Sequence, residues 1–381
     1  MTRKNFGKSI TPAHPHTILK FKLINEYIKA WAQKLMNNDS CHSLVYIDCM
    51  CNSGIYQADN GNEVDGTAIL VARTLEQVSQ TYPKKQVELY FNDLDEKKTV
   101  LLKKHLPEET SNFHIHVQNM DMKAYLRNIG SQLRGKKYLH YFLLYDPYDA
   151  HIEWEVLVPF FHNWGEVLIN HMVSDTIRAL PSAKRAEAIE KYENTYLANL
   201  SDLLPFGSNK KAYEDRIHQI IDKIKGGQNY YIGTFPVFNS KNALVYDLLH
   251  CTNNIEGFKL YKKCAWQVSN GRSSDKNISR EPNLFQTEFD FEGEVDNSIK
   301  LSVDEECFGI PDIAEYLYKK YSGQGAIPVA KIWKDLELHP VFPADGFRNQ
   351  IKDILISNYA IKKCKVIDQT TGAKVEALDF K

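Results

Sequence analysis

Apolar residues along the chain are arranged first at helical spacing and then in short runs that alternate with helical segments. They recur every fourth position from Leu19 to Leu35, which predicts an amphipathic helix. The short runs that follow predict strands at 44–48, 87–92, 113–117, 138–145 and 166–170. Nearly continuous apolar strands between helices are typical of a parallel sheet covered on both faces. The first part of the chain therefore predicts a doubly wound α/β domain.

This alternation ends after residue 170. Residues 174–227 have the charge spacing of solvated helices, and two strand patterns at 230–238 and 243–251 then flank a hairpin signal. Five parallel strands followed by a terminal hairpin is the order expected of a methyltransferase sheet. Residues 1–290 are therefore predicted to form a Rossmann-like class I methyltransferase domain, with a helical insertion at 174–227.

The last part of the chain has a different pattern. Residues 291–304 are acidic and polar, which suits a linker. Three helical patterns and two strand-like pieces follow it, at 311–321, 328–336, 345–357, 360–367 and 374–380. Three short helices and a β-hairpin predict a winged-helix domain over 305–381.

Composition narrows the classes of protein to consider. The net charge is −1, so an anionic partner must be met by a local patch. The seven cysteines include no CxxC pair, which indicates free thiols in a reducing compartment. No run of about 18 apolar residues occurs. We therefore expect a cytoplasmic protein that does not enter a membrane.

The first apolar run ends in an acid and enters a loop of small residues, Asp48-Cys49-Met50-Cys51-Asn52-Ser53-Gly54. Such a loop lets a cofactor touch the backbone, and an added Cβ would block that approach. We expect it to hold the methionine half of S-adenosylmethionine (SAM); the predicted contacts are Asp48, Cys51, Asn52, Gly54 and Tyr56.

Acids after the next two strands complete the predicted cofactor site. Asp93, or Asp95 just beyond it, would accept hydrogen bonds from the ribose hydroxyls, and Asp121 would bind the adenine amine. Helix caps and strand ends are often acidic for structural reasons alone. Both interpretations therefore stay open for each of these acids.

Asp146, Pro147 and Tyr148 follow the fourth strand and are the predicted catalytic residues. The motif is similar to the (Asp/Asn)-Pro-Pro-(Tyr/Phe) motif of amino-methyltransferases. In those enzymes a base amine donates to the acid or amide oxygen and to a prolyl carbonyl, and the aromatic ring stacks on a flipped base. One proline is missing here, and Asp149 follows the tyrosine. A simple turn is the alternative.

Other chemistry-bearing residues give weaker signals. His114 and His116 alternate on the third strand, and Cys49 and Cys51 have no matching ligand pair, so we expect sheet residues, buried thiols and no metal site. The predicted nucleic-acid-binding residues of the winged helix are Arg348, Lys352, Lys362 and Lys363. Acids offset these cations, so a protein-docking winged helix is equally compatible.

Taken together, these residues resemble the three-Cys-motif partner family, TcmP. Lys20, Tyr27-Ile28 and Trp31 fit its opening helix, Asp48, Gly54 and Tyr56 fit its first loop, and residues 166–170 match its Glu-Val-Leu-Ile-Asn strand. The resemblance spans about residues 16–290. It implies a methyltransferase-like fold and a partnership with a radical-SAM-type protein that carries three cysteines.

Two hypotheses follow. The first is a SAM-dependent methyltransferase that acts on DNA or RNA, at a base amine, within an antiphage defence or modification cassette. The second is a catalytically degenerate methyltransferase fold that binds nucleic acid or serves as a scaffold for the radical-SAM-type partner. The motif at Asp146 favours the first. Asn52 and Asp149 favour the second. Asn52 replaces a loop glycine; asparagine tolerates a positive φ, but its side chain would crowd a cofactor. Asp149 stands where the family has a glycine after Asp-Pro-(Phe/Tyr).

Overall fold

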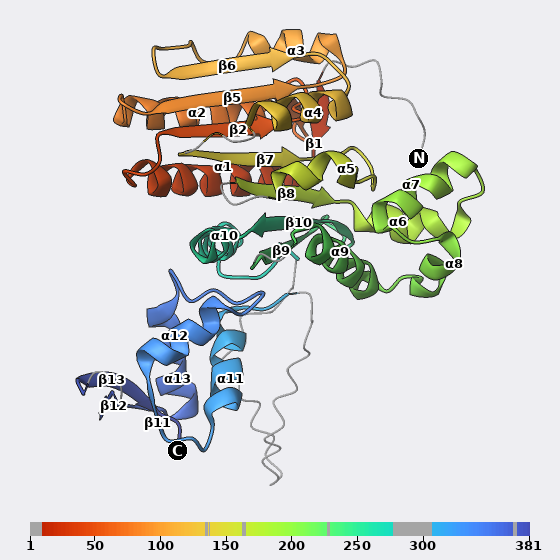
Figure 1. Cartoon of the computed structure of the whole chain (residues 1–381). Helices are drawn as coiled ribbons and strands as arrows, with labels where there is room; N and C mark the ends of the chain where they lie inside the picture. Colours follow the sequence, from red (N-terminus) through yellow and green to blue (C-terminus); the bar gives the residue numbers. More distant parts are fainter. Residues whose placement is uncertain are drawn as a thin grey trace.

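The computed structural model describes residues 10–133, 136, 138–161, 165–226, 229–276, 307–368 and 372–381. Its centre is a seven-stranded sheet (Figure 1), whose strands in spatial order are β6 (Phe113–Gln118), β5 (Gln86–Asn92), β2 (Ser43–Asp48), β7 (Leu139–Tyr145), β8 (Gly165–His171), β10 (Leu244–Thr252) and β9 (Tyr231–Phe238). The first five strands are parallel, and β10 runs antiparallel to both β8 and β9. The predicted α/β sheet with a terminal hairpin is confirmed.

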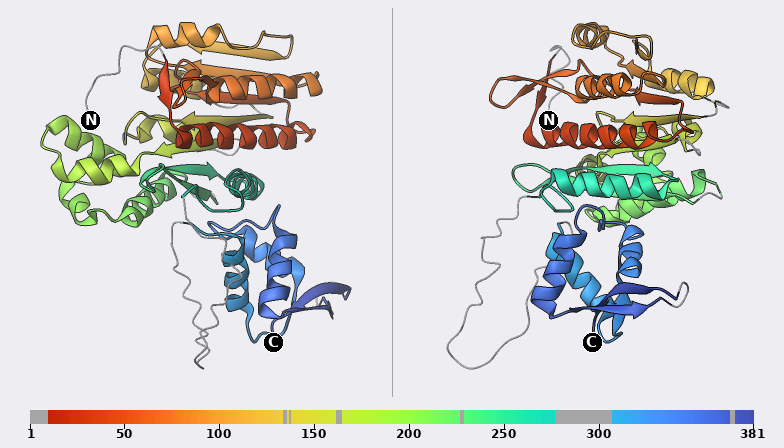
Figure 2. Two further views of the ribbon diagram at one scale, coloured as in Figure 1. Left: turned by 180° about the vertical axis from the view of Figure 1, so that it is seen from behind. Right: turned by 90° about the vertical axis from the view of Figure 1, so that its left-hand side faces the viewer.

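Helices cover both faces of this sheet (Figures 1 and 2). One face packs against α1 (Pro15–Met36), α2 (Thr67–Thr81) and α10 (Ile255–Val268), and the other against α4 (Met122–Leu133) and α5 (Trp154–Leu157). Side chains alternate along a strand, so Leu44 and Tyr46 face the first set of helices while Val45 and Ile47 face the second. Helix α3 (Glu96–Lys103) connects β5 to β6.

The predicted insertion is helical and lies beyond the carboxyl ends of the parallel strands (Figure 1). It consists of α6 (Val173–Ala179), α7 (Ala186–Tyr196), α8 (Leu200–Leu203) and α9 (Lys210–Ile224). Short 3₁₀ turns occur at Val158–Phe160, Leu180–Ser182 and Leu204–Phe206. Buried residues of the insertion, Tyr196 and Ile217 among them, belong to the same core as Val45 and Ile47. The insertion is therefore built onto the sheet and shares its core.

The polar segment 57–66 contains strands. β3 (Ile55–Ala58) and β4 (Glu63–Asp65) pair antiparallel, and β1 (Thr11–Ala13) adds to β3 in parallel. The polar sequence gives no period-two signal for these strands. Backbone hydrogen bonds, including those to the distant strand β1, stabilise them instead. Helix α5 (Trp154–Leu157) is a single turn, since Pro159 lies in the 3₁₀ turn that follows it.

The C-terminal part, residues 307–381 as far as they are described, contains the three expected helices. Its elements are α11 (Ile310–Tyr321), β11 (Ala326–Pro328), α12 (Val329–Glu337), α13 (Arg348–Tyr359), β12 (Lys362–Ile367) and β13 (Lys374–Asp379). The strands form a three-stranded sheet in the order β11-β13-β12. The predicted linker at 291–304 lies outside the described residues, and the predicted domain boundaries stay predictions.

Helix α10, which the sequence pattern did not predict, joins the two parts. Trp266 on α10 is buried in the core of the C-terminal part. Lys262, one turn earlier, donates from Nζ to carbonyl oxygens of that part; the acceptors are Leu336 at 3.2 Å, Glu337 at 3.0 Å, His339 at 2.6 Å and Phe342 at 3.1 Å. The other face of the same helix packs on the large sheet. Helix α10 is therefore shared by the two cores.

Among the described helices, none is both long enough and apolar enough to cross a bilayer.

Candidate active site at the carboxyl edge of the sheet

Three predicted site acids meet where three neighbouring strands end. Asp48 closes β2, and it lies opposite Phe91 of β5 and Leu144 of β7. Asp93 and Asp146 each follow two residues beyond those partners. Neighbouring strands are about 4.8 Å apart, so the three carboxylates share one edge of the sheet. This edge includes the switch point between β2 and β7, where ligands of open α/β sheets bind.

Asp48 is almost fully buried, with 3% of its surface exposed. Burial, reinforced by the negative charge of Asp146, raises the pKa of this carboxyl to about 8. A hydrogen bond from the Met50 amide at 3.2 Å to Oδ1 opposes that shift. Asp48 is therefore largely protonated at neutral pH, and a cation placed beside it would favour its ionised form.

Asp146 is held by two residues that the sequence analysis did not identify as part of the site. Lys20 on α1 donates from Nζ to Oδ2 at 2.5 Å, and Asn170 at the end of β8 donates from Nδ2 to Oδ1 at 2.6 Å. Lys20 is only 8% exposed. The available signal for Lys20 was a lysine between apolar residues of an otherwise apolar helix face. Asn170 lies one residue before the end of β8, close to the same edge as the acids.

Asn52 adopts the positive φ that was expected of it, 59°. Its side chain donates from Nδ2 to Thr11 Oγ1 at 3.1 Å and accepts from the Ser53 amide at 2.7 Å. Its own amide donates to Asp93 Oδ2 at 2.9 Å. Strand β1, which carries Thr11, therefore holds the side chain that replaces the loop glycine.

Packing is one reason for a glycine at position 54. The φ of Gly54 is 73°, and a Cβ would lie 2.6 Å from Leu102 and 2.9 Å from Ile69. These neighbours belong to the core, so a side chain here would clash with it, and the predicted cofactor contact of Gly54 stays a prediction. Elsewhere in the predicted loop set, Cys51 is buried, as is Cys49, and Tyr56 packs against Phe21 with ring centroids 4.7 Å apart.

Asp93 accepts three hydrogen bonds in this structure. The Asp95 amide donates to Oδ1 at 2.9 Å, while the Asn52 amide and the Tyr148 hydroxyl donate to Oδ2 at 2.9 and 3.1 Å. Lys98 on α3 also donates to the Tyr148 hydroxyl, at 2.9 Å. Since Tyr148 follows β7 and Asp93 follows β5, the tyrosine side chain spans the end of β2 between them.

Of the remaining predicted site residues, two cap helices and one is buried beside Asp146. Asp95 caps α3 by accepting from the Lys97 amide at 2.9 Å, and Asp93 lies close enough to Asp48 for its charge to raise the pKa of that carboxyl. Asp121 caps α4 through Oδ1, which accepts from the amides of Lys123 and Ala124. Pro147 is buried beside Asp146.

The histidines of β6 lie in the sheet as expected. His116 stacks on Tyr90 with centroids 4.5 Å apart and lies 3.8 Å from Glu88. Within the described ranges, no group of three or more His, Cys, Asp or Glu side chains could hold a metal ion.

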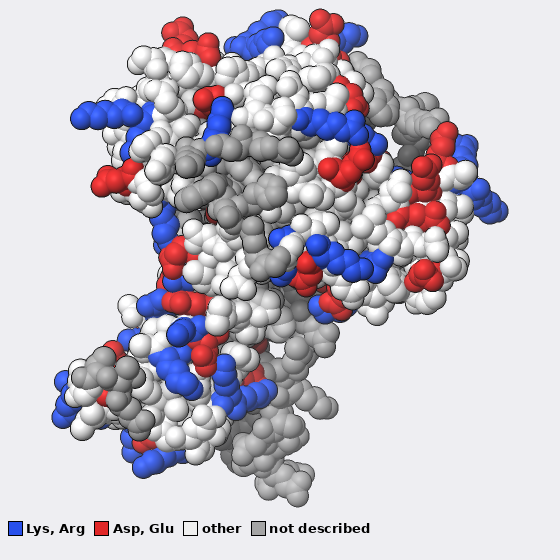
Figure 3. Space-filling view, in the orientation of Figure 1, with Lys and Arg blue, Asp and Glu red and all other residues white. Residues whose placement is uncertain are grey.

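The four predicted nucleic-acid-binding residues differ in whether a carboxylate lies close to their charge. Arg348 pairs with Asp345 at 2.7 Å and Glu337 at 3.3 Å, and Lys352 lies 3.6 Å from Glu376. Lys362 and Lys363 are exposed on β12. In Figure 3, Lys and Arg side chains are prominent on the C-terminal part. On the larger part, by contrast, positive and negative side chains are mixed. Two of the four residues are therefore already neutralised by carboxylates.

Comparisons with known proteins add little to this description. No family model matches the chain, and the comparison with curated proteins found no match. Among solved structures, an O-methyltransferase from Bacillus cereus in complex with SAH is 10% identical, with 60% of this chain and 80% of that chain covered and a TM-score of 0.35. Human methyltransferase-like protein 13 in complex with SAH is 9% identical, with 65% and 92% covered and a TM-score of 0.31. The description of the fold therefore rests on the strand order given above. The TcmP resemblance stays an expectation.

Proposed function

We propose that the chain binds SAM at the carboxyl edge of the sheet and transfers its methyl group to a base amine of a nucleic acid. The observation that carries this proposal is the convergence of Asp48, Asp93 and Asp146 at the ends of adjacent strands. SAM carries a positive sulfonium and an amino group. A partly buried site with more carboxylates than cations stabilises such a ligand.

Each residue of the edge has a task in this proposal. Asp48 and the loop after it face the methionine half, Asp93 accepts from the ribose, and Asp121 offers Oδ2 to the adenine amine because Oδ1 caps α4. When bound, SAM supplies an electrophilic methyl group. Asp48 gives up its proton as the cation arrives, so SAM binding near neutral pH should release protons.

Asp146 would orient the acceptor. Lys20 and Asn170 each occupy one of its roughly four lone-pair sites, so both oxygens can still accept from an amine. Accepting an N–H from the base turns the nitrogen lone pair towards the methyl group, and such positioning lowers the barrier. Tyr148 has 62% of its surface exposed. Its ring would stack on the base once the Tyr148 hydroxyl has broken its hydrogen bond to Asp93.

Calorimetry with SAM and S-adenosylhomocysteine tests the cofactor step. We expect binding that Asp48→Asn weakens, with Asp95→Asn as the matched control because asparagine also caps a helix. Transfer of a labelled methyl group to DNA or RNA then tests the reaction. Absence of SAM binding by the folded protein would overturn the proposal.

A second candidate function is a scaffold with no catalysis. The observation in its favour is that Asp93, the ribose acceptor, already receives three hydrogen bonds from the chain itself. In this proposal the C-terminal part is a winged helix that contacts nucleic acid through Lys362 and Lys363, and a radical-SAM-type protein with three cysteines is the partner. Its tests are loss of oligonucleotide binding in Lys362→Glu/Lys363→Glu and co-purification with that partner.

A further inference from the structure

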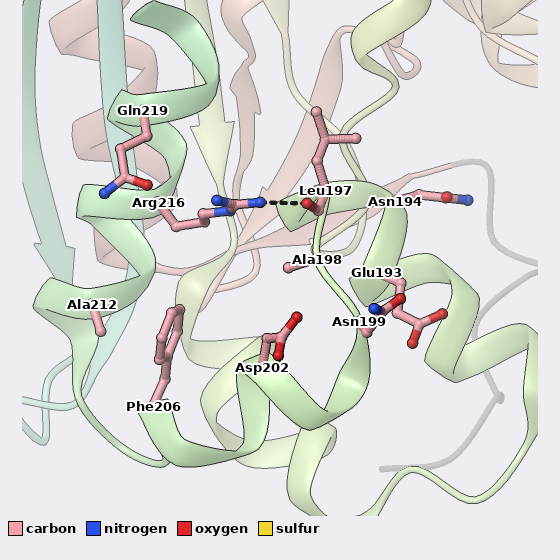
Figure 4. Close-up of a pocket in the computed structure, with 10 residues that line it drawn as sticks. All are labelled: Glu193, Asn194, Leu197, Ala198, Asn199, Asp202, Phe206, Ala212, Arg216 and Gln219. Atoms are coloured by element: carbon pink, nitrogen blue, oxygen red, sulfur yellow. Dashed lines mark hydrogen bonds between the residues drawn. The ribbon is translucent and has the colours of Figure 1, made fainter. Parts of the chain in front are cut away.

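The helical insertion contains a pocket that the proposed reaction does not use. It lies between α7, the turn after it, α8 and α9, and its volume is about 670 Å³ (Figure 4). A volume in the range of roughly 300–1,000 Å³ is typical of small-molecule sites. Its wall is mainly polar, with carboxylate, amide and guanidinium groups and a single aromatic ring. It is therefore suited to a polar ligand.

Arg216 on α9 is fixed at one side of this pocket. Its Nε donates to the Tyr196 carbonyl at 2.6 Å and its Nη2 to the Leu197 carbonyl, where α7 ends (Figure 4). Two of its five N–H donors are thus used, and no carboxylate pairs with it in the described ranges. The guanidinium is pre-organised by backbone carbonyls, and its remaining N–H groups can donate to a ligand that offers acceptors.

The opposite side of the pocket has acceptors and a ring. In Figure 4 the Asp202 carboxylate and the Phe206 ring face the space below Arg216. Within the described part of the chain, the Asp202 carboxylate has no hydrogen-bonded or ion-paired partner, and it is exposed. Phe206 packs edge-on against Tyr213 with centroids 5.3 Å apart, which fixes the ring at the wall. This side therefore offers a hydrogen-bond acceptor and a flat ring face to a ligand.

We propose that this pocket binds the guanine base of a nucleotide. Guanine offers the acceptors O6 and N7 on one edge, which pair with arginine in the commonest specific base contact. Its N1–H and 2-amino groups lie on another edge, where a carboxylate can accept from both. Its face stacks on an aromatic ring. Adenine lacks the O6 acceptor and the N1–H, so the pocket discriminates against it.

The pocket is linked to the carboxyl edge of the sheet through α7. Lys191 of α7 lies 3.2 Å from Asp149, three residues after Asp146. Thr195 of α7 accepts from the Ile152 amide at 3.2 Å and donates to the Ala150 carbonyl at 2.9 Å. A nucleic-acid strand bound both in this pocket and at the carboxyl edge would present one base to Asp146 and a guanine to Arg216. This specificity rests on the proposed function, whereas guanine binding itself does not require SAM.

Saturation-transfer NMR of the full chain with GMP, IMP and AMP tests the inference. We expect GMP to bind, IMP to bind several-fold more weakly because it lacks the 2-amino group, and AMP to give no specific signal. Asp202→Asn should weaken GMP binding about tenfold and remove the preference over IMP. Phe206→Ala should weaken it by about tenfold or more through lost stacking.

The controls keep a folding defect apart from a lost contact. Asp215→Asn changes the same charge on α9, outside the pocket, where Asp215 pairs with Lys211, and it should leave GMP binding unchanged. Arg216→Lys keeps the charge but loses the fork, and it should abolish the preference for GMP over AMP. Equal binding of all three nucleotides, no GMP binding, or GMP binding unaffected by Asp202→Asn would each overturn the inference. SAM binding measured on the same variants reports separately on the proposed function.

Discussion

Lys20 Nζ and Asp146 Oδ2 lie 2.5 Å apart, in an ion pair that joins the first helix to the end of β7. The side chains are only 9% and 21% exposed, so solvent screens the pair weakly. Lys20→Met leaves the Asp146 carboxylate without its counter-charge and should lower the free energy of unfolding by about 2–4 kcal/mol. Urea unfolding measures this change.

The double variant Lys20→Met/Asp146→Asn should recover most of that loss, because no unpaired charge then remains. Lys22→Met on the exposed side of the same helix is the matched control and should change stability by less than about 0.5 kcal/mol. Equal effects of Lys20→Met and Lys22→Met would contradict the importance of the pair.

The buried carboxyl of Asp48 makes stability depend on pH. Its pKa of about 8 in the native state exceeds that of the unfolded chain, so the native protein holds a proton that the unfolded chain releases above about pH 4. The free energy of unfolding should fall by about 1.4 kcal/mol per pH unit across this window, as an upper bound. Asp48→Asn cannot titrate and should gain stability over the wild type as the pH rises from 5 to 8.

Thermal unfolding of both proteins at several pH values measures this difference. The difference in melting temperature should be small near pH 4 and largest near pH 8. If the melting temperatures of the two proteins change with pH in the same way, Asp48 is ionised in the native state across this pH range.

Tyr148→Phe separates the ring of this residue from its hydroxyl. The hydroxyl donates to Asp93 at 3.1 Å, where it competes with the ribose proposed to bind there. A hydrogen bond to a charged group is worth about 1.5–3 kcal/mol net, so without this competitor SAM should bind about tenfold more tightly or better. Calorimetry measures the affinity, and Tyr138→Phe, at another exposed tyrosine, should leave it unchanged. Weaker binding by Tyr148→Phe would mean that the hydroxyl contacts the cofactor itself.

Asp146→Ala tests the orienting role proposed for this carboxylate, because an asparagine at this position would keep an oxygen that accepts from the amine. Methyl transfer should fall by a factor of about 10², which is typical for loss of a positioned charged group. SAM affinity should change little, because this acid faces the acceptor. Single-turnover transfer at saturating SAM measures the chemical step, and undiminished transfer would favour another acceptor-binding group.

Limited proteolysis tests the predicted boundary between the two domains. Acidic, polar residues between Glu292 and Glu305 should be cut first. The two fragments should then co-elute, because Lys262 and Trp266 on α10 keep the C-terminal part attached. Separation of the fragments in gel filtration would contradict this attachment.

Periodicity and strand-end acids predicted most of the large domain correctly. Strands β2, β5, β6, β7 and β8 follow apolar runs, and Asp48, Asp93 and Asp146 lie at one edge because parallel strands end together. The small sheet was missed because β1 pairs with a segment more than forty residues away, and no local pattern records such a pairing.

The parts of the site that the sequence did not reveal come from other elements. Lys20 reaches Asp146 across 126 positions, and Asn170 across 24, through tertiary packing alone. The αL conformation of Asn52 was predictable from its side chain, whereas its bond to Thr11 was not. The winged-helix assignment and the roles of Arg348, Lys352, Lys362 and Lys363 stay predictions.

The position of α10 between two cores gives the molecule a mechanical property. At one end of this connection, α10 carries Trp266 into the C-terminal part; at the other, Glu256 on α10 lies 2.6 Å from Lys34 on α1. Both helices are uninterrupted, and α1 carries Lys20 in its first turns. The C-terminal part is therefore coupled through α10 to α1, the helix whose Lys20 ammonium pairs with Asp146.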